Sequence, residues 1–321
     1  MTTPSPLADI EQPEVLVVAK LWPPMMESLR SVFRVHDRIH QTDPTALAAV
    51  APRIRAIAGS GESKVPRELI AQLPALEIIS VFGVGYDGVD VAAARERGSA
   101  VPHTPNVLND EVADLAIALV LSAARRIPQA DRYVREGRWA NGPMPLARKV
   151  SGARLGIVGL GRIGNAIAKR AEAFGMTIAY TARSAKPESS YRYFPSAEAL
   201  AAEVDFLVVI TPGGAGTRKL IDAKVLKALG KEGYLINVAR GSVVDEAALV
   251  EALQNGTIAG AGLDVFENEP HVPAALIALD NVVLTPHVGS ATWQTRRAMA
   301  DRAFGNLEAH FAGKPLLSPV P

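Results

Sequence analysis

The stretch Leu155-Gly-Ile-Val-Gly-Leu-Gly-Arg-Ile-Gly164 decides the fold of this chain. Its first half is a short apolar run typical of a buried parallel strand, and a helical pattern follows over 165–174. Glycines spaced GxGxxG between a strand and a helix allow a tight turn, close approach of a ligand to the backbone and close helix–strand packing. A pyrophosphate would then meet the free amides at the start of the helix. The stretch predicts a dinucleotide site made of Gly159, Leu160, Gly161, Arg162, Ile163 and Gly164; a glycine turn without a ligand is the alternative.

Strand-like runs alternate with helical patterns on both sides of this motif. The runs cover 14–19, 54–59, 78–82, 155–159, 178–180, 206–210, 234–238, 261–264 and 282–284. Helical patterns cover 68–72, 89–97, 165–174 and 246–254, with longer ones over 109–126 and 292–311. This alternation predicts an α/β fold with parallel sheets, in two clusters before residue 103 and after residue 154. A length of 321 residues also fits about two domains at roughly 150 residues each.

Composition narrows the classes of function. Lys and Arg total 34 against 33 Asp and Glu, so the chain lacks the overall basic excess of most nucleic-acid binders. It has no cysteine, which excludes disulfides, thiolate nucleophiles and cysteine-held metals and fits a reducing cytoplasm. The longest apolar stretch, 115–124, is too short for a bilayer, and the first 13 residues lack a secretory pattern. The six histidines show no paired metal spacing, so we expect no metal site. From the apolar stretch, the first residues and the lack of cysteine, we expect no membrane association and a cytoplasmic location.

The end of the second strand after the glycine motif bears on the choice of cofactor. NAD sites usually place Asp or Glu there, about 20 residues on, against the ribose hydroxyls. Here the residues are Ala182, Arg183 and Ser184, and no acid occurs before Glu188. A guanidinium matches a 2′-phosphate, whereas a carboxylate would repel one. We therefore expect NADPH to be preferred and NADH to be possible; a solvated Arg183 with use of both cofactors is the alternative.

Three ionisable residues of different types follow three later strands. Arg240 follows 235–238, Glu269 follows 263–266, and His287 follows 283–286. Open α/β sheets bind their ligands at the carboxyl ends of their strands. Reduction of a 2-oxo acid needs a cation on the carboxylate and carbonyl, and a proton donor for the developing alkoxide. Arg240 and His287 fit these roles, and Glu269 would favour the proton-loaded imidazole. Taken singly, each residue could equally be a solvated or structural one.

Six motifs together resemble the D-isomer-specific 2-hydroxyacid dehydrogenase family over nearly the whole chain. They are Gly83-Val-Gly-Tyr-Asp87, His103-Thr-Pro-Asn-Val107, Gly159 to Gly164, Asn237-Val-Ala-Arg-Gly241, Gly262-Leu-Asp-Val-Phe266 with Glu269-Pro270, and Pro286-His-Val-Gly-Ser-Ala291. The resemblance implies the roles given above for Arg240, Glu269 and His287. It also implies a flavodoxin-like substrate domain of residues 1–100 and 288–321, with a Rossmann cofactor domain of residues 101–287 inserted in it and a cleft between them.

The resemblance implies further binding residues. The amides of Val84 and Gly85 would bind the substrate carboxylate, with Ser290 as a further substrate contact, and Asp264 would contact the nicotinamide carboxamide. Further cofactor contacts would come from Thr211, Pro212, Thr217, Val238, Ala239 and Gly289. The loop Thr211-Pro-Gly-Gly-Ala-Gly-Thr217 departs from the family's usual Leu-Thr-Pro-Glu-Thr run, which leaves contacts on the nicotinamide side open.

Within the family, the chain is similar to glyoxylate and hydroxypyruvate reductases. It would reduce a small 2-oxo acid to the D-2-hydroxy acid, as a homodimer joined through the cofactor domain, and Trp139 resembles a residue lent to the neighbouring subunit's pocket. The helix over 109–126 fits such an interface, or plain packing within its domain. The alternatives are phosphoglycerate, phosphite or formate dehydrogenase chemistry on the same scaffold, and a cofactor-sensing corepressor that only binds. The physiological 2-oxo acid is not determined by the sequence.

Overall fold

The structure is a computed structural model that describes residues 12–320. Contacts divide the chain into two compact units, Met1–Leu108 with Thr292–Pro321 (unit 1) and Asn109–Ala291 (unit 2), so unit 2 is inserted in unit 1 along the sequence. The divisions expected from the family resemblance, at 100/101 and 287/288, lie eight and four residues before these. Among the described residues, no helix is both long and apolar enough to cross a membrane.

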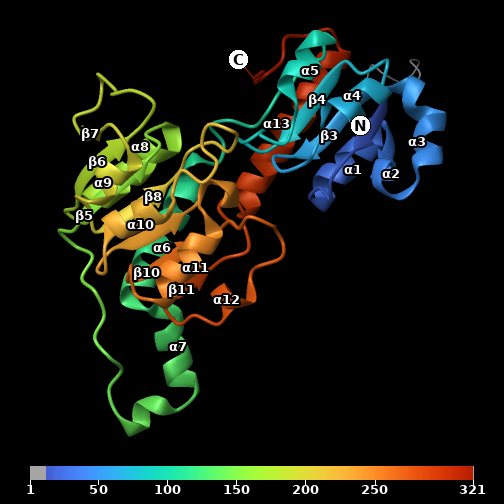
Figure 1. The fold of residues 1–321 in the computed structure, drawn as a ribbon. Coiled ribbons are helices and arrows are strands. Elements are labelled where there is room, and N and C mark those ends of the chain that lie inside the picture. The colour runs from blue at the N-terminus through green and yellow to red at the C-terminus, as the bar shows by residue number, and fades with distance from the viewer. Residues whose placement is uncertain (1–11, 321) are drawn as a thin grey trace, which may run out of the picture. The chain divides into compact units, whose positions relative to one another are not determined.

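Unit 1 is built on a parallel sheet of the order β2-β1-β3-β4. Its strands are β1 (Glu14–Val17), β2 (Arg34–Asp37), β3 (Ile54–Ser60) and β4 (Ile78–Phe82). Its helices are α1 (Pro23–Val32), α2 (Ile39–Thr42), α3 (Pro44–Val50), α4 (Arg67–Gln72), α5 (Val91–Glu96) and α13 (Trp293–Phe311), with a 3-10 turn η1 (Ala51–Arg53). Figure 1 shows the last helix beside the strands of the first hundred residues.

Helices cover both faces of the sheet in unit 1. On one face, Leu16, Ile57 and Ile79 pack with residues of α3, α4 and α5 in one buried cluster. On the other, α13 packs on β4, where the buried Ser80 hydroxyl donates to Ala303 O at 2.8 Å. The Phe33 ring, just after α1, contacts two rings of α13. These packed helices fix the strand ends that carry the loops described below.

Unit 2 has a seven-stranded parallel sheet of the order β11-β10-β9-β8-β5-β6-β7. Its strands are β5 (Arg154–Val158), β6 (Thr177–Thr181), β7 (Arg192–Phe194), β8 (Phe206–Val209), β9 (Tyr234–Asn237), β10 (Gly260–Leu263) and β11 (Val282–Leu284). Its helices are α6 (Asn109–Arg125), α7 (Ile127–Arg135), α8 (Arg162–Glu172), α9 (Ala197–Ala201), α10 (Ala223–Leu229), α11 (Glu246–Gln254) and α12 (Ala274–Ile277), with 3-10 turns η2 (Arg138–Asn141) and η3 (Gly241–Val243). The chain runs outward from β5 to β7 and returns on the other side at β8. The order of strands therefore reverses between β5 and β8, where doubly wound sheets bind their ligands.

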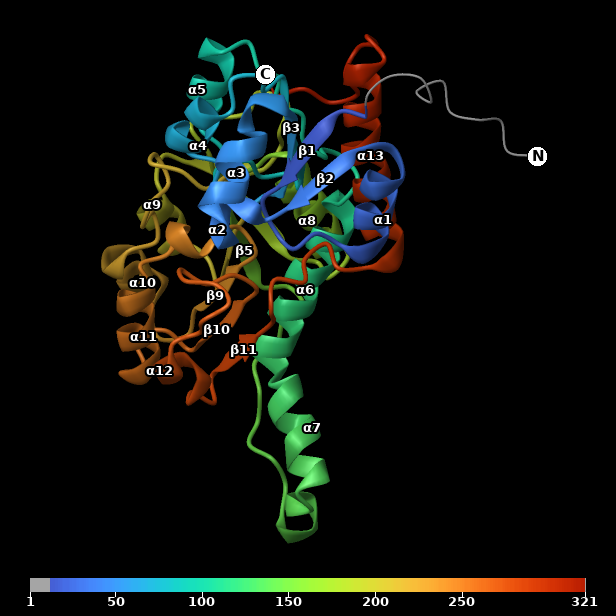
Figure 2. The same cartoon turned by 90° about the vertical axis from the view of Figure 1, so that its right-hand side faces the viewer.

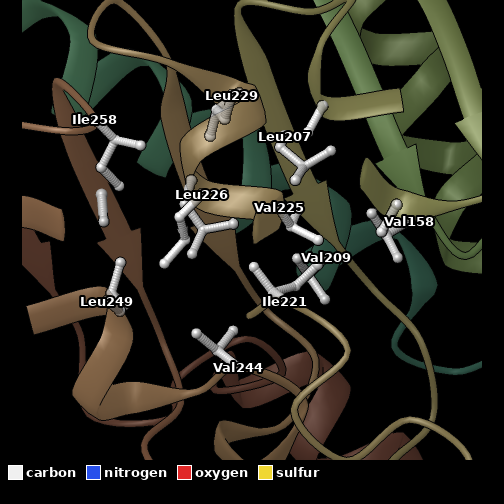
Figure 3. Packing of buried hydrophobic residues seen from close by; sticks show 14 of the residues in the cluster. Val158, Leu207, Val209, Ile221, Val225, Leu226, Leu229, Val244, Leu249 and Ile258 are labelled. Carbon is white, nitrogen blue, oxygen red and sulfur yellow. The ribbon is translucent and has the colours of Figure 1, made fainter. Parts of the chain in front are cut away.

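Apolar side chains from the strands and helices of unit 2 interlock in one large cluster. Figure 3 shows strand residues facing those of the covering helices, among them Val158, Leu207, Val209, Val225, Leu226, Leu229 and Leu249. A fully buried aliphatic side chain stabilises the fold by roughly 1.5–3 kcal/mol, so this cluster holds the sheet rigid beneath its loops. The α/β class and the parallel sheets predicted from the sequence are confirmed.

The helix α6 buries its apolar face within unit 2. It packs on α8, β9 and β10, and its buried side chains include Val112, Ile117, Leu119 and Val120. Packing within its own unit therefore accounts for the apolar pattern over 109–126. Four exposed apolar side chains lie further on, in α7 and the segment after it, and α7 projects beyond the sheet of its unit in both views (Figures 1 and 2).

Candidate active site

The turn from β5 to α8 has the geometry that the glycine motif predicts. Gly159 has φ of 109°, a conformation that disfavours a side chain, and a Cβ there would lie 2.8 Å from Ile210 O. A Cβ on Gly164 would lie 2.3 Å from Gly159 O, so the helix packs directly on the turn. A Cβ on Gly161 would meet no described atom within 4 Å, which leaves this backbone open to a ligand. The turn can therefore hold a pyrophosphate at the start of α8.

The segment after β6 lies beside this turn, because Gly159 N donates to Thr181 O at 2.9 Å. Arg183 and Ser184 follow and are exposed, and Lys186 N donates to the buried Tyr180 hydroxyl at 2.6 Å. The strand end thus presents a guanidinium and a hydroxyl next to the glycine turn. On the other side of the turn, Thr211 Cγ2 lies 3.1 Å from the position of a Gly159 Cβ, which places the 211–217 loop against it.

The turn after β9 presents Arg240. The Asn237 side chain, 1% exposed, accepts from Ala239 N at 3.1 Å and donates to Arg240 O at 3.0 Å, so it shapes this turn from within. Arg240 Nη1 also donates to Ala239 O at 2.7 Å. A Cβ on Gly241 would lie 1.9 Å from the Phe266 carbonyl carbon. Only glycine permits this approach, which brings the Arg240 turn against the end of β10.

Glu269 and His287 form a hydrogen-bonded pair. Glu269 Oε2 lies 2.7 Å from His287 Nδ1, and Glu269 Oε1 accepts from Phe266 N at 3.0 Å. The two side chains are 25% and 29% exposed, so solvent screens the pair only partly. Burial pushes the pKa of the Glu269 carboxyl upward, but the hydrogen bond and charge of His287 outweigh it and hold that pKa below its usual value. The charge of Arg240 lowers the same pKa, so the guanidinium is within electrostatic range of the pair.

A second carboxylate, Asp264, holds the backbone around His287. His287 has φ of 51°, a left-handed conformation that non-glycine residues seldom adopt and that often marks a functional site. Asp264 O accepts from His287 N at 2.9 Å, Asp264 Oδ1 from Val288 N at 2.8 Å, and Asp264 Oδ2 from Gly289 N at 2.8 Å. Asp264 is 2% exposed, and its Oδ1 also accepts from the Thr285 hydroxyl at 2.6 Å. The carboxylate therefore fixes the loop that carries the imidazole.

The loop after β4 carries the substrate-binding residues predicted for unit 1, Val84 and Gly85. His103 Nδ1 lies 2.9 Å from Val84 O, and Thr104 N donates to Gly83 O at 2.8 Å. His103 is held in turn, because the Ser318 hydroxyl donates to His103 O at 2.6 Å. The 83–85 loop is thus fixed by the crossing segment at 103–104.

Comparison with known proteins identifies the family. A family model described as D-isomer specific 2-hydroxyacid dehydrogenase, NAD binding domain, matches residues 117–289. A hydroxyphenylpyruvate reductase of Plectranthus scutellarioides is 54% identical over 289 residues, which are 90% of this chain and 92% of that protein. The chain belongs to the D-isomer-specific 2-hydroxyacid dehydrogenases.

Two further relatives of this dehydrogenase show how far the likeness extends. The glyoxylate/hydroxypyruvate reductase A of Arabidopsis thaliana is 53% identical over 267 residues, covering 83% of this chain and 85% of that protein. The crystal structure of an NADPH-dependent glyoxylate/hydroxypyruvate reductase from Sinorhizobium meliloti, in complex with NADP and malonate, has a TM-score of 0.91 at 50% identity. The structural match covers 97% of this chain and 97% of the Sinorhizobium chain. The resemblance drawn from the sequence motifs is confirmed.

Unit 2 of this dehydrogenase brings together most of the predicted site residues. The turn at 159–164, the segment 182–184 and the 211–217 loop meet around the end of β5, and Arg240, Glu269 and His287 meet at the ends of β9, β10 and β11. Ser290 lies three residues beyond His287. Trp139 is different, because it lies in η2 after the projecting α7 and is 69% exposed.

Sequence reasoning missed the supporting roles of Asn237, Thr285 and Asp264, although it named Asp264 as a cofactor contact. Asn237 shapes the Arg240 turn, Thr285 supports Asp264, and Asp264 holds the His287 loop. The spacing of Asn237 from Arg240 is a signal for the first, since Asn side chains often bond to the backbone two or three residues on. The predicted contact of Asp264 with the carboxamide stays a prediction.

Proposed function

We propose that this dehydrogenase reduces small 2-oxo acids, of the glyoxylate or hydroxypyruvate type, to D-2-hydroxy acids. The observation that carries the proposal is the 2.7 Å pair of Glu269 and His287, within electrostatic range of Arg240, at the strand ends of a Rossmann unit. These are the groups that carbonyl reduction needs: a cation for the carboxylate and a held proton donor. The similar reductases of Arabidopsis and Sinorhizobium act on glyoxylate and hydroxypyruvate by name, which supports the same substrates here.

The groups around the end of β5 fit NADPH. Gly161 leaves open backbone where a pyrophosphate would approach, and α8 begins at the next residue. Arg183 and Ser184 offer a guanidinium and a hydroxyl to a 2′-phosphate, and no carboxylate stands at that strand end to repel it. NADPH supplies the hydride when it is bound.

The residues of the chain do the remaining chemistry. The Arg240 guanidinium binds the substrate carboxylate and polarises the 2-oxo group. His287 donates the proton from Nε2, the ring nitrogen that does not face Glu269, to the oxygen that becomes the hydroxyl. The Glu269 carboxylate orients the ring through Nδ1 and favours its protonated form. Val84, Gly85 and Ser290 are proposed as further substrate contacts.

Steady-state kinetics test this function and cofactor together. Each of NADPH and NADH is paired with glyoxylate, hydroxypyruvate, pyruvate and phenylpyruvate. We expect kcat/KM to be at least about tenfold higher with NADPH, since one charge-assisted contact to the 2′-phosphate provides roughly this factor. No turnover with any of the four acids would refute the reductase function. Equal efficiency with NADH would refute the cofactor preference alone.

We also propose that two copies of this chain form a homodimer through α7 and the segment that follows it. Four large apolar side chains there are exposed: Ile127 (51%), Val134 (57%), Trp139 (69%) and Leu146 (98%). Such a concentration marks an interaction surface, and a second copy of this chain would cover it while bringing Trp139 to the neighbouring pocket. Light scattering should give twice the 34.0 kDa of the chain, and Leu146→Asp should shift the mass to one copy. A monomeric parent protein would refute this. A cytoplasmic location stays a prediction.

A further inference from the structure

Two tryptophans in unit 1 contact each other beyond the carboxyl end of strand β1. Trp22 lies between β1 and α1, and Trp293 is the first residue of α13. Their ring centroids are 5.9 Å apart, with the planes tilted by 59°. The Trp293 side chain is nevertheless 77% exposed. An indole is the largest apolar side chain, so its exposure beside a second indole calls for a ligand or a structural reason.

The pair is not needed to join the two helices. Phe33 after α1 already packs against Phe304 and Phe311 of α13, with centroid separations of 6.0 and 5.6 Å. The Phe33 ring is 2% exposed, so that contact is the buried one. The contact between Trp22 and Trp293 lies at the opposite end of α13, where helix packing has given way to solvent. A role outside the core is therefore the better account of it.

The backbone holds both indoles in place. Trp22 O accepts from the amides of Met25 and Met26 in the first turn of α1. The Thr292 hydroxyl caps α13 by accepting from Thr295 N at 3.2 Å, which fixes the backbone of Trp293 in the turn between them. Trp293 opens α13, and Trp22 is the residue directly before α1. Side chains held at packed helices are more precisely placed than side chains on loops, so the pair forms a firm aromatic surface.

The proposed carboxylate-binding loop also lies at the carboxyl ends of the strands of unit 1. The strands of unit 1 are parallel, so the residues after β1 and after β4 lie at one edge, separated by β3 and hence by about 10 Å. A second link is Arg296, one helical turn after Trp293, whose guanidinium carbon lies 5.6 Å from the centre of the Phe82 ring. Phe82 ends β4 and directly precedes Gly83, so the start of α13 lies beside the 83–85 loop.

The chemistry of the two places suits one kind of molecule. The amides of Val84 and Gly85 would take a carboxylate, and an uncharged aromatic surface lies at a distance of about 10 Å along the edge. A 2-oxo acid with an aryl group on C3 has a carboxylate at one end and a ring at the other, and with a ring–ring contact of about 5 Å beyond its own length it can bridge this distance. Tilted indoles accept such a ring in an edge-to-face or offset arrangement. Glyoxylate has no substituent that reaches them.

We propose that Trp22 and Trp293 form the subsite for the aromatic 3-substituent of an aryl 2-oxo acid, so that this dehydrogenase accepts phenylpyruvate-type substrates as well as small ones. The inference rests on the proposed function, because it places the carboxylate of the substrate on Val84 and Gly85. It assigns Trp293 to substrate specificity. The indole contacts the side chain of the substrate and takes no part in the reaction at the carbonyl group.

The test compares kcat/KM for phenylpyruvate and for glyoxylate in the parent enzyme, Trp293→Ala and Trp293→Phe. We expect Trp293→Ala to lower kcat/KM for phenylpyruvate by about tenfold, the factor for losing one ring–ring contact with its buried area. The value for glyoxylate should stay within about twofold of the parent. Trp293→Phe should recover most of the loss, since it restores an aromatic surface. Ile277→Ala, which removes an exposed apolar side chain (64%) in unit 2, should alter neither value.

Several results would overturn the subsite. A parent enzyme that reduces glyoxylate but not phenylpyruvate refutes it and leaves the proposed function intact. An equal loss for both substrates in Trp293→Ala, tracked by a lower melting temperature, shows that the pair is only structural. An unchanged ratio of the two kcat/KM values also refutes it. A parent enzyme that reduces neither acid refutes the proposed function itself.

Discussion

Replacing Glu269 by Gln tests whether the hydrogen-bonded carboxylate keeps the proton donor loaded. Glu269 Oε2 lies 2.7 Å from His287 Nδ1. Gln keeps the size, removes the charge and replaces one acceptor oxygen with a donor nitrogen. An opposite charge at this distance shifts the pKa of a partner by about 1–3 units. The two side chains are 25% and 29% exposed, so we take the lower end, about one unit or 1.4 kcal/mol.

The sign of the effect follows from the direction of the reaction. Reduction requires the protonated imidazole, so kcat/KM falls as pH rises through the pKa of the donor. A neighbouring carboxylate favours the charged imidazole and extends the active range to higher pH. Without that charge, the imidazole loses its proton earlier. The basic limb of the profile should therefore move down by about one pH unit in Glu269→Gln.

The assay is kcat/KM for glyoxylate with saturating NADPH, measured from pH 5 to pH 10. The matched control is Glu267→Gln, which removes a carboxylate two residues away that pairs with Arg218 at 3.2 Å. That control should leave the basic limb where it is in the parent enzyme. A limb that stays in place in Glu269→Gln, or moves to higher pH, would refute the role given to this pair.

Three further changes test other parts of the structure. Asp264→Asn turns one acceptor oxygen into a donor that faces the Val288 or Gly289 amide. We expect kcat to fall by about 10–100-fold in stopped-flow assays, while the Kd of NADPH stays within about threefold of the parent value. An unchanged kcat would contradict the positioning role. Arg183→Ala should raise the KM for NADPH by about tenfold and leave that for NADH unaltered, and equal changes in both would exclude a contact with the 2′-phosphate. Asp205→Asn should cost unit 2 about 2 kcal/mol at pH 7 in denaturant titrations, because hydrogen bonds from Arg154 and the charge of Arg148 hold the pKa of the Asp205 carboxyl below its usual 3.8. A lowered pKa stabilises the fold above the pKa of the unfolded chain. The difference should therefore shrink once pH falls below 3.8 and vanish below the lowered pKa of the folded protein, and a difference that persists in stronger acid would contradict the ion pair.

Periodicity predicts the central elements of both sheets well, because a strand buried on both faces reads as an unbroken apolar run. The runs over 54–59, 155–159 and 206–210 match the inner strands β3, β5 and β8 to within one residue at each end. The edge strands β2 and β7 were missed. Each is short and carries polar or exposed residues, Arg34 and His36 in one and Arg192 in the other, so neither shows an apolar run. Edge strands are commonly short and charged, since this prevents pairing with other chains.

The residue types of the candidate site were predictable from the sequence, but the hydrogen bonds and the backbone conformation that hold them in place were not. Arg240, Glu269 and His287 each follow a strand, and the carboxyl ends of parallel strands share one edge. The left-handed backbone of His287 depends on the exact path of the loop after β11, and so do the three hydrogen bonds that the amides of His287, Val288 and Gly289 donate to Asp264. The contact between Trp22 and Trp293 joins positions 271 residues apart, and no local pattern encodes it.

The most direct test of the proposed chemistry is the single-turnover rate of His287→Ala with NADPH and glyoxylate. A general acid typically contributes 10²–10⁴-fold, so hydride transfer should slow by at least about 100-fold while the Kd of NADPH stays near that of the parent enzyme. A rate within about tenfold of the parent would mean that another group donates the proton, and the site would have to be assigned anew.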